Sequence, residues 1–364
     1  MPIYMDVHIV PGVTSKAVAE AHNLDVAIQD EHDCKCMTYW IDEVRESVFC
    51  LIEAPNREAV KDMHDKAHGL IPHKIIEVNS SLVESFLGRI YDPSDGAKTE
   101  TGLPLITDSP YRILVVTRTT DPVLLRHQLG DAAQSLLQAH NAVIRRNLAQ
   151  FGGREVEHSG SGFLLSFSSA TAAVNCALAI HNDMPKADAD QLGFRMSITS
   201  GTPVTENEEL FGDTIQMAQQ LCFIPRPFQV TVASSVKELI ARDGLHQQNQ
   251  VMALSATDEA LLRSLFRILE ERWQDADFDV DDYGRAMAMS KSQLYRKCLA
   301  LTGLAPNVLI KEYRLEKAKE LMRGQQYNIA QITFDSGFTS PSYFTKCFKK
   351  RYGILPGSYL ELLQ

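Results

Sequence analysis

The sequence lacks several features that would place it in a membrane or in a disulfide-stapled class. It contains no apolar run long enough to cross a bilayer, and no basic segment followed by an apolar stretch opens the chain. Cysteine is sparse, with seven scattered residues in 364, an odd number that does not suggest a disulfide framework. Free thiols in a reducing compartment are the simpler interpretation. We therefore expect a cytoplasmic protein without a membrane partner.

Acidic residues are scarce at one end of the chain. From residue 285 to 364 there are thirteen Lys and Arg against five Asp and Glu, a net charge of +8. Because the whole chain carries −10, residues 1–284 carry −18. A basic end on an acidic body indicates one module that faces nucleic acid and one or more that do not.

The length predicts two or three domains, and the hydrophobic fraction of 45% is ample for their cores. A segment rich in Pro, Gly, Ser, Thr and Asp predicts a linker at 91–110. Residues 1–90 alternate in the order βαββαβ, which is typical of a ferredoxin-like fold. Residues 111–245 predict an α+β domain with a mostly antiparallel sheet. An acidic stretch at 270–282 precedes purely helical patterns, and we assign 258–364 to the last domain.

Local signals refine this multidomain α+β assignment. Thr14 is expected to cap a helix in the first domain, and Gly69 to end the second helix there. In the middle domain we expect a strand over 111–117, one long helix over 122–151, and a hairpin after the glycine pair 152–153.

The first domain is rich in histidine. It holds six of the eleven histidines in the chain: His8, His22, His32, His64, His68 and His73. His64 and His68 stand four residues apart on one predicted helix, so both imidazoles share a face and suit one metal ion. Imidazole together with thiolate or carboxylate favours late transition metals over Mg²⁺ or Ca²⁺. For His32 and His73 we favour ordinary surface positions.

Further ligand candidates come from the strands and the first helix. Asp6 shares a strand face with His8, and Cys50 lies in the middle of another strand. His22, on the first helix, is expected to approach the His64/His68 pair. His8 is expected to face the other side of the sheet, in a separate site at an interface. The pair Cys34 and Cys36 is too close in sequence to close a site alone.

Four stretches cover nearly the whole first domain: "MPIYMDVHIVPGVT", "VAEAHNLD", "MTYWIDEVRESVFCLIEAPNREAV" and "MHDKAHGLIPHKIIEV". They resemble a small family of nickel-binding ferredoxin-like proteins. The resemblance implies a dimeric α+β barrel and bound Ni²⁺ or another late transition metal. The candidate metal ligands are His8, His22, Cys50, His64 and His68.

The basic end predicts two helix-turn-helix units. Ser290 and Gln293 form a capping box before one helix, and Ser340 with Pro341 opens the corresponding helix of the second unit. The stretches "MSKSQLYRKCLALTG" and "IAQITFDSGFTSPSYFTKCFKKRYGILPGSY" resemble the DNA-binding domain of AraC/XylS-type transcription regulators. The resemblance implies two recognition helices in adjacent major-groove segments of an operator.

Short polar and basic side chains lie on the outer face of each second helix. Arginine can fork to guanine and serine can reach several base edges, whereas flanking lysines suit phosphates. The candidate base-reading residues are Ser292, Arg296, Ser342 and Lys346, and the candidate phosphate contacts are Lys291, Lys297, Lys349, Lys350 and Arg351.

Three stretches of the middle domain carry a resemblance: "HNAVIRRNLAQFGGREVEHSGSGFLLSFSSATAAVNCALAIH", "MSITSGTPV" and "LFGDTIQMAQQLC". They resemble class III nucleotide cyclases. Such enzymes use two aspartates for two metal ions, and an Asn and an Arg at the transition state. Here Thr117 and Ser161 stand at the aspartate positions, and Gln216 and Gln220 at the other two. Neutral hydroxyls cannot replace carboxylates for a hard dication, so we predict that the catalytic chemistry is absent.

Together these features favour a metal-responsive transcription regulator that binds double-stranded DNA, works as a homodimer and is not an enzyme. A second hypothesis places the effector, a nucleotide or small organic molecule, in the cyclase-like domain. A third is a redox or monooxygenase-like enzyme that uses the His/Cys set of the first domain, although no acid–base pair or cofactor motif is visible.

Overall fold

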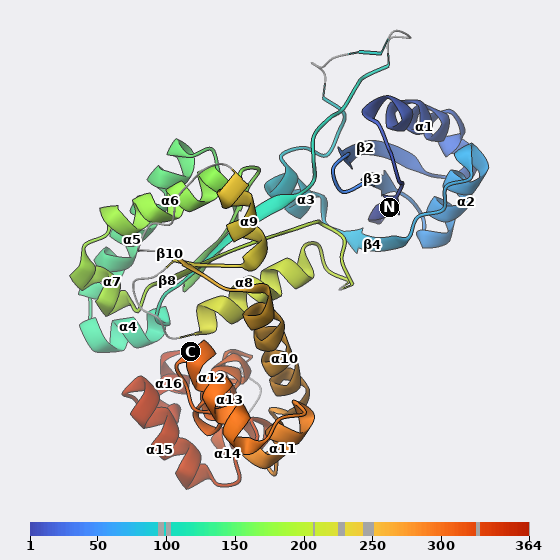
Figure 1. The fold of residues 1–364 in the computed structure, drawn as a ribbon. Helices are drawn as coiled ribbons and strands as arrows, with labels where there is room; N and C mark the ends of the chain where they lie inside the picture. The colour runs from blue at the N-terminus through green and yellow to red at the C-terminus, as the bar shows by residue number, and fades with distance from the viewer. Residues whose placement is uncertain are drawn as a thin grey trace.

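The computed structural model divides the chain into three regions placed one after another (Figure 1). The N-terminal domain lies beside a sheet-containing middle domain, and a helical C-terminal domain lies against another side of the middle domain. The structure describes residues 1–93, 98–99, 103–206, 208–224, 230–242, 251–324 and 328–363.

The first domain is a four-stranded antiparallel sheet in the order β2-β3-β1-β4. The predicted βαββαβ order is confirmed, and an additional helix follows it. The Thr14 hydroxyl accepts a hydrogen bond from the Ala17 N–H, and Gly69 ends the second helix in a left-handed conformation, as expected. The elements are β1 (Ile3–Ile9), α1 (Ser15–Ile28), a 3₁₀ turn (Gln29–His32), β2 (Lys35–Asp42), β3 (Ser47–Glu53), α2 (Arg57–His68), β4 (Lys74–Val78) and α3 (Ser80–Leu87).

The middle domain is built on a six-stranded sheet in the order β10-β9-β8-β5-β7-β6. Its β8–β9 and β9–β10 pairings are parallel and the other three are antiparallel, so the sheet is mixed. The elements are β5 (Arg112–Arg118), α4 (Pro122–Leu129), α5 (Ala132–Gln150), β6 (Arg154–Ser159), β7 (Gly162–Phe167), α6 (Ala170–Asp183), α7 (Lys186–Leu192), β8 (Arg195–Gly201), α8 (Gly212–Phe223), β9 (Val230–Val232), α9 (Ser234–Arg242) and β10 (Val251–Ala253).

One prediction for this domain is wrong. The sequence pattern predicted one helix over 122–151, whereas the structure has α4 and α5 with a break between them. Gly130 takes φ 59° and ψ −137°, which lies outside the helical region and is accessible to glycine at little cost. The helix therefore ends there and restarts in a new direction.

The C-terminal domain is entirely helical within the described residues, as expected. The predicted capping box is confirmed, because Ser290 accepts from the Gln293 N–H while Gln293 accepts from the Ser290 N–H. Ser340 caps the corresponding helix of the second unit. The elements are α10 (Ala256–Arg272), α11 (Val280–Ala286), α12 (Lys291–Thr302), α13 (Pro306–Arg323), α14 (Ile329–Asp335), α15 (Pro341–Tyr352) and α16 (Pro356–Leu362).

The segment predicted as a linker is partly packed. Residues 94–97 and 100–102 lie outside the described residues, but the segment after them runs along β2. Ile106 is buried in the core between the first sheet and its helices, and the Asp108 carbonyl accepts a hydrogen bond from the Ile41 N–H. The predicted end of the middle domain, at 245, also lies outside the described residues.

The sheet of the first domain is covered on both faces. Helices α1 and α2 cover one face. The other face presents Met5, Trp40 and Phe49, which pack with α3 and with Leu114 and Phe211 of the middle domain. The middle domain thus covers the sheet face opposite to α1 and α2.

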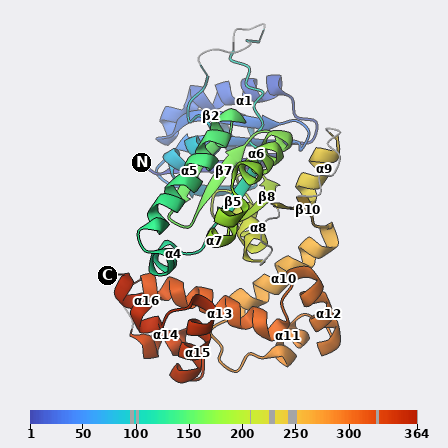
Figure 2. The same ribbon diagram turned by 90° about the vertical axis from the view of Figure 1, so that its left-hand side faces the viewer.

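The C-terminal domain is anchored to the middle domain by a buried carboxylate. Asp121 caps α4 through one oxygen, while its other oxygen accepts hydrogen bonds from Arg323 and from the Tyr359 hydroxyl. Leu124 of α4 is buried in the core of the second helix-turn-helix unit. Figure 2 shows the C-terminal helices lying across one end of the middle domain. None of the helices in the described ranges combines the length and apolar character that crossing a bilayer requires.

The turn of the second helix-turn-helix unit depends on Gly337. Its φ is 75°, and an added Cβ would lie 2.1 Å from the Trp273 carbonyl oxygen. We expect Gly337→Ala to lower the free energy of unfolding of this region by more than the about 1–2 kcal/mol that the left-handed backbone alone costs. Urea unfolding followed by amide exchange in α14 and α15 measures the effect. The matched control is Gly357→Ala, where no atom lies within 4 Å, and an unchanged or higher stability is expected there.

Candidate functional site

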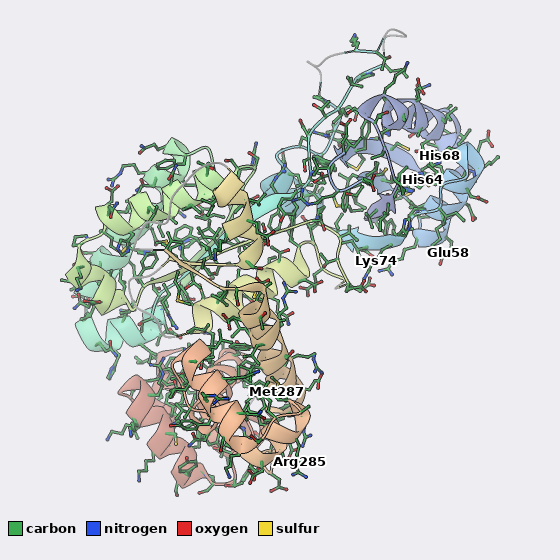
Figure 3. The ribbon with its side chains drawn as sticks, in the orientation of Figure 1. Glu58, His64, His68, Lys74, Arg285 and Met287 are labelled. Atoms are coloured by element: carbon green, nitrogen blue, oxygen red, sulfur yellow. The ribbon has the colours of Figure 1, made fainter. Side chains whose placement is uncertain are left out.

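The strands of the first domain bring three ligand-type side chains to one face. Asp6 and His8 alternate along β1 and therefore point to the same side of the sheet. Cys50 of β3 pairs directly with Asp6 in the antiparallel register. Helix α2 lies over this face and adds His64 and His68, which Figure 3 labels.

His64 is held between two carboxylates. Its Nε2 lies 3.0 Å from an oxygen of Asp6, and its Nδ1 lies 3.1 Å from an oxygen of Asp25 on α1. His68 reaches the same Asp25 oxygen at 3.3 Å. On the other side, His8 Nε2 lies 3.3 Å from the second oxygen of Asp6. The side chains of His64 and Asp6 are each 1% exposed, so this is a buried ionic cluster.

The charges in this cluster stabilise one another. Burial alone would raise the pKa of the Asp6 carboxyl, but the His64 and His8 imidazoles outweigh it and hold that pKa well below its usual range. Burial alone would lower the pKa of His64, yet the Asp6 and Asp25 carboxylates raise it to about 10. Burial and the two nearby carboxylates raise the pKa of the Cys50 thiol.

The arrangement fits a metal ion. The potential ligand atoms of Asp6, His8, Cys50 and His64 all lie within 4.8 Å of one another, and those of Asp25, His64 and His68 form a second such group. One buried oxygen of Asp6 has an imidazole at 3.3 Å but no hydrogen bond of acceptable geometry, so it has a lone pair to offer. Imidazole, thiol and carboxylate form a ligand set for late transition metals, and a bound ion would displace the protons of the thiol and of His64.

The structure brings four of the five predicted ligands into the two ligand groups. His8, Cys50 and His64 come together with Asp6, and His68 joins through Asp25. The expectation that His8 faces the far side of the sheet is wrong, because its ring centroid lies 4.8 Å from that of His64. Strand alternation from the buried Asp6 would have placed it correctly.

Two residues of α1 differ from the prediction: His22 lies outside both ligand groups, and Asp25 lies in one of them. His22 approaches Asp92 at 3.4 Å and packs against Tyr39, and it belongs to neither ligand group. Asp25 was missed, although it stands seven residues after the buried Val18 and so on the core face of α1. A carboxylate on a core face is the signal that could have found it.

A cavity of about 690 Å³ opens at the cyclase-like positions of the middle domain. Thr117, Ser161, Gln216 and Gln220 all line it, together with residues of α10 and α13. The Thr117 hydroxyl accepts a hydrogen bond from the Phe163 N–H, so it already holds β7 of the β6–β7 hairpin against β5. Among the described residues, no group of three or more metal-ligand side chains lies within reach of one ion here.

Two further facts limit what this cavity accepts. Its three basic side chains are each paired with a carboxylate: Arg118 with Glu316, Lys317 with Glu270 and Arg323 with Asp121. The side-chain oxygen of Gln220 is buried and has no hydrogen-bond partner. The cavity therefore offers a triphosphate no unpaired basic side chain, but it offers an acceptor to a neutral donor.

The two second helices of the C-terminal domain expose the side chains expected to meet DNA. On α12, Ser292, Arg296 and Lys297 are exposed, and Lys291 pairs with Asp281 at 3.0 Å. On α15, the residues Ser342, Lys346, Lys349 and Lys350 are exposed. Arg351 is also exposed, but it pairs with Glu312 and stacks on Tyr352.

Sequence reasoning passed over two exposed aromatic residues on these helices. Tyr295, which follows a buried core position, is 50% exposed, and Tyr343, which precedes one, is 53% exposed. Their exposure beside Arg296 and Ser342 adds apolar surface to each recognition helix. The core positions themselves, Leu294 and Phe344, are fully buried.

The first and the last domain of the chain each match a known protein family. Residues 4–78 match the family described as "Nickel responsive protein SCO4226-like", and residues 283–361 match a helix-turn-helix domain family. The first domain belongs to the SCO4226-like family. The last is a helix-turn-helix domain.

Individual relatives match parts of the chain. Histidine kinase P4 of Formosa agariphila is 37% identical over 108 residues, which are 30% of this chain and 8% of that protein. The HTH-type transcriptional regulator MtrA of Neisseria gonorrhoeae is 28% identical over 124 residues, 33% of this chain and 41% of that protein. The chain thus spans less than half of the length of either relative.

Two solved structures resemble other parts. SCO4226 from Streptomyces coelicolor A3(2) is 34% identical to the SCO4226-like domain, covering 21% of this chain and 94% of that chain, with a TM-score of 0.20. The middle region is similar to adenylate cyclases from Trypanosoma brucei, at 16% identity, 37% of this chain, 77% of that chain and a TM-score of 0.32.

The buried ionic cluster of the SCO4226-like domain makes His64 important for stability. We expect His64→Leu to lower the free energy of unfolding of the metal-free protein by about 3–5 kcal/mol, because two carboxylates lose their shared partner. Urea unfolding of the first domain, monitored by amide exchange in β1 and α2, measures it. The control is His22→Gln, whose partner Asp92 has a side chain that is 35% exposed, and a loss of no more than about 1 kcal/mol is expected. Equal losses in the two variants would contradict the buried ionic role.

Proposed function

We propose that this chain is an AraC-type transcription regulator that binds double-stranded DNA and responds to a transition metal, with nickel favoured. One observation carries the proposal: a buried cluster of imidazoles, carboxylates and a thiol lies in the SCO4226-like domain of a chain that ends in a helix-turn-helix domain. A regulator of this kind works in the compartment that holds the DNA, so we propose the cytoplasm.

His8, Cys50 and His64 with Asp6 would hold the ion, and His68 with Asp25 forms the adjoining ligand group. His64 belongs to both groups and presents Nε2 to one and Nδ1 to the other. The ion would supply positive charge among carboxylates that His64 now neutralises. We therefore propose that metal binding rearranges α2 relative to β1. His22 would act only as a neighbour of the pocket that these residues line.

For DNA, we propose that Ser292, Arg296, Ser342 and Lys346 read bases and that Lys291, Lys297, Lys349 and Lys350 contact phosphates. Arg351 stays in the proposal as a phosphate contact only through the part of its side chain left exposed, since Glu312 already holds its guanidinium. The exposed positions on both helices support this assignment.

A homodimer is also part of the proposal. The covered face of the first sheet favours a pairing surface elsewhere. Exposed apolar side chains on and near α1 and α2, namely Leu24, Val26, Leu70 and Ile71, offer such a surface.

The second candidate function places a small effector in the cavity of the middle domain. Its volume of about 690 Å³ lies in the range of ligand pockets, and the unpartnered Gln220 oxygen favours a ligand with a hydrogen-bond donor. The paired basic residues favour a neutral or cationic organic molecule over a nucleoside triphosphate. Metal analysis of the purified protein separates this candidate from the first.

The metal assignment is tested by removing the helix pair. We expect His64→Ala, His68→Ala to remove at least one equivalent of Ni²⁺ from the protein, because both ligand groups lose imidazoles. Titration calorimetry and elemental analysis measure the stoichiometry. DNA affinity in the absence of metal should stay unchanged, because the helix-turn-helix domain lies outside this site, and amide exchange in β1 and α2 checks that the first domain of the variant is folded. Full Ni²⁺ stoichiometry in the double variant would reject this site and favour the cavity as the sensor.

The DNA assignment is tested by two basic residues of different expected roles. Arg296→Ala should cost about 1–3 kcal/mol of binding free energy and relax the sequence preference at one position. Lys349→Ala should weaken binding to all sequences and reduce the slope of log affinity against log salt by about one. Selection from a random duplex pool followed by titration at several salt concentrations measures both. Sequence-independent losses in both variants would exclude base reading by Arg296.

We also propose that the chain has no cyclase activity. Incubation with ATP or GTP and Mg²⁺ or Mn²⁺ should yield no cyclic nucleotide, because Thr117 and Ser161 offer hydroxyls where two carboxylates are needed. Chromatographic detection of cyclic AMP and cyclic GMP measures it, and turnover by the unaltered protein would overturn the proposal.

A further inference from the structure

Helix α8 touches both of the other domains, one at each end. At its start, Phe211 is fully buried in the cluster that covers the first sheet, with its ring centroid 4.7 Å from that of Phe86. At its end, Phe223 packs against Phe266 of α10 at 5.4 Å and Tyr313 of α13 at 5.9 Å. A helix of 12 residues spans about 18 Å, so it bridges the middle domain between these contacts.

The strands under Phe211 are those that carry the ligand cluster. Asp6 and His8 alternate along β1 with Met5 and Val7, and Cys50 of β3 stands between Phe49 and Leu51. The ligand-type residues Asp6, His8 and Cys50 face α2. Their apolar neighbours Met5, Val7, Phe49 and Leu51 belong to the cluster that contains Phe211. A shift of either strand therefore moves both faces at once.

The segment before α8 is also tied to the first domain by charged side chains. Arg57, the first residue of α2, pairs with Glu208 at 2.8 Å. Lys74 of β4 donates a hydrogen bond to the Glu206 carbonyl. These contacts are exposed and weak individually, but the first connects the helix that bears His64 to the segment before α8, and the second connects β4 to it.

Helix α8 is fixed to its own sheet along its length. The Thr199 hydroxyl donates to the Thr214 carbonyl and the Ser197 hydroxyl donates to the Ala218 carbonyl, both from β8. At the far end the Cys222 thiol donates to the Val116 carbonyl of β5. Packed elements of this kind transmit displacements because interiors are dense and resist compression.

We propose that α8 couples the ligand cluster of the first domain to the helix-turn-helix domain, with Phe211 and Phe223 as positioning residues at its two ends. This inference rests on the proposed function, since it names the route by which that regulator works. The aromatic trio Phe223, Phe266 and Tyr313 joins the end of α8 to α13, the helix that connects the two helix-turn-helix units. Metal-dependent movement of β1 and β3 thus reaches the spacing of the two recognition helices.

The test compares metal-linked DNA affinity in the full chain. The probe is a duplex that the unaltered protein selects from a random pool, titrated with and without Ni²⁺. Coupling between two sites typically changes affinity by 5- to 150-fold. We expect Phe223→Ala to bring the ratio of the two affinities to within twofold of one, while Ni²⁺ stoichiometry stays unchanged. By reciprocity, the duplex should alter Ni²⁺ affinity by the same ratio in the unaltered protein and should not in the variant.

Controls separate coupling from general loosening. Phe151→Ala removes a partly buried phenylalanine from the same core, away from α8, and should keep the ratio of the unaltered protein. Phe223→Tyr keeps the ring and should restore the ratio. If the alanine variant does not fold, Phe223→Leu replaces it, and we expect the ratio of affinities to move toward one by a smaller amount.

The outcomes are distinct. Retention of the full ratio in Phe223→Ala and Phe223→Leu, or its equal loss in Phe151→Ala, overturns the role of α8 while the proposed function stands. A ratio of one in the unaltered protein, with both ligands bound, overturns the metal response and the coupling together.

Discussion

The arrangement of this chain follows from a sheet that is buried on both faces. The central strands β1 and β3 are buried over nearly their whole length, so neither face tolerates water. Two helices cover one side, and the chain must supply a second cover for the other. It uses α3 and the middle domain, whose Phe211 is buried in the same core as Met5, Trp40 and Phe49. The position of the middle domain, and through it that of the helix-turn-helix domain, depends on this requirement.

A second constraint acts on the helical side of the same sheet. Asp6 and Asp25 are buried carboxylates, and buried charges persist only when they are paired. His64 pairs with both, which fixes α1, α2 and β1 to one another through a single imidazole. The metal-ligand group and the packing of this domain therefore share the same side chain. Any ion that takes an imidazole nitrogen from these carboxylates also changes what holds the two helices on the sheet.

Local chemistry in the sequence predicted most elements and much of the cluster. The capping box at Ser290 and the helix end at Gly69 are determined by residues within one turn, so they could be read directly. The break at Gly130 was missed because a single glycine is compatible with a continuing helix until tertiary packing decides. Asp25 was missed since its partners, His64 and His68, come from another helix that lies far away in the sequence. The contact between Phe211 and the first sheet joins segments more than a hundred residues apart, and no local pattern encodes it.

The family match to the helix-turn-helix domain begins at residue 283, but the folded unit begins earlier. The Tyr283 hydroxyl donates to the Leu265 carbonyl, and Arg314 donates to the Trp273 carbonyl, so α10 and its C-cap residue supply acceptors to α11 and α13. Leu262, Leu265 and Leu269 of α10 lie in the same core as Leu294 of α12. Sequence families delimit what recurs among relatives, whereas folding delimits what must be buried together. In this chain a helix-turn-helix domain cut at residue 283 would lose α10, whose leucines fill part of its hydrophobic core.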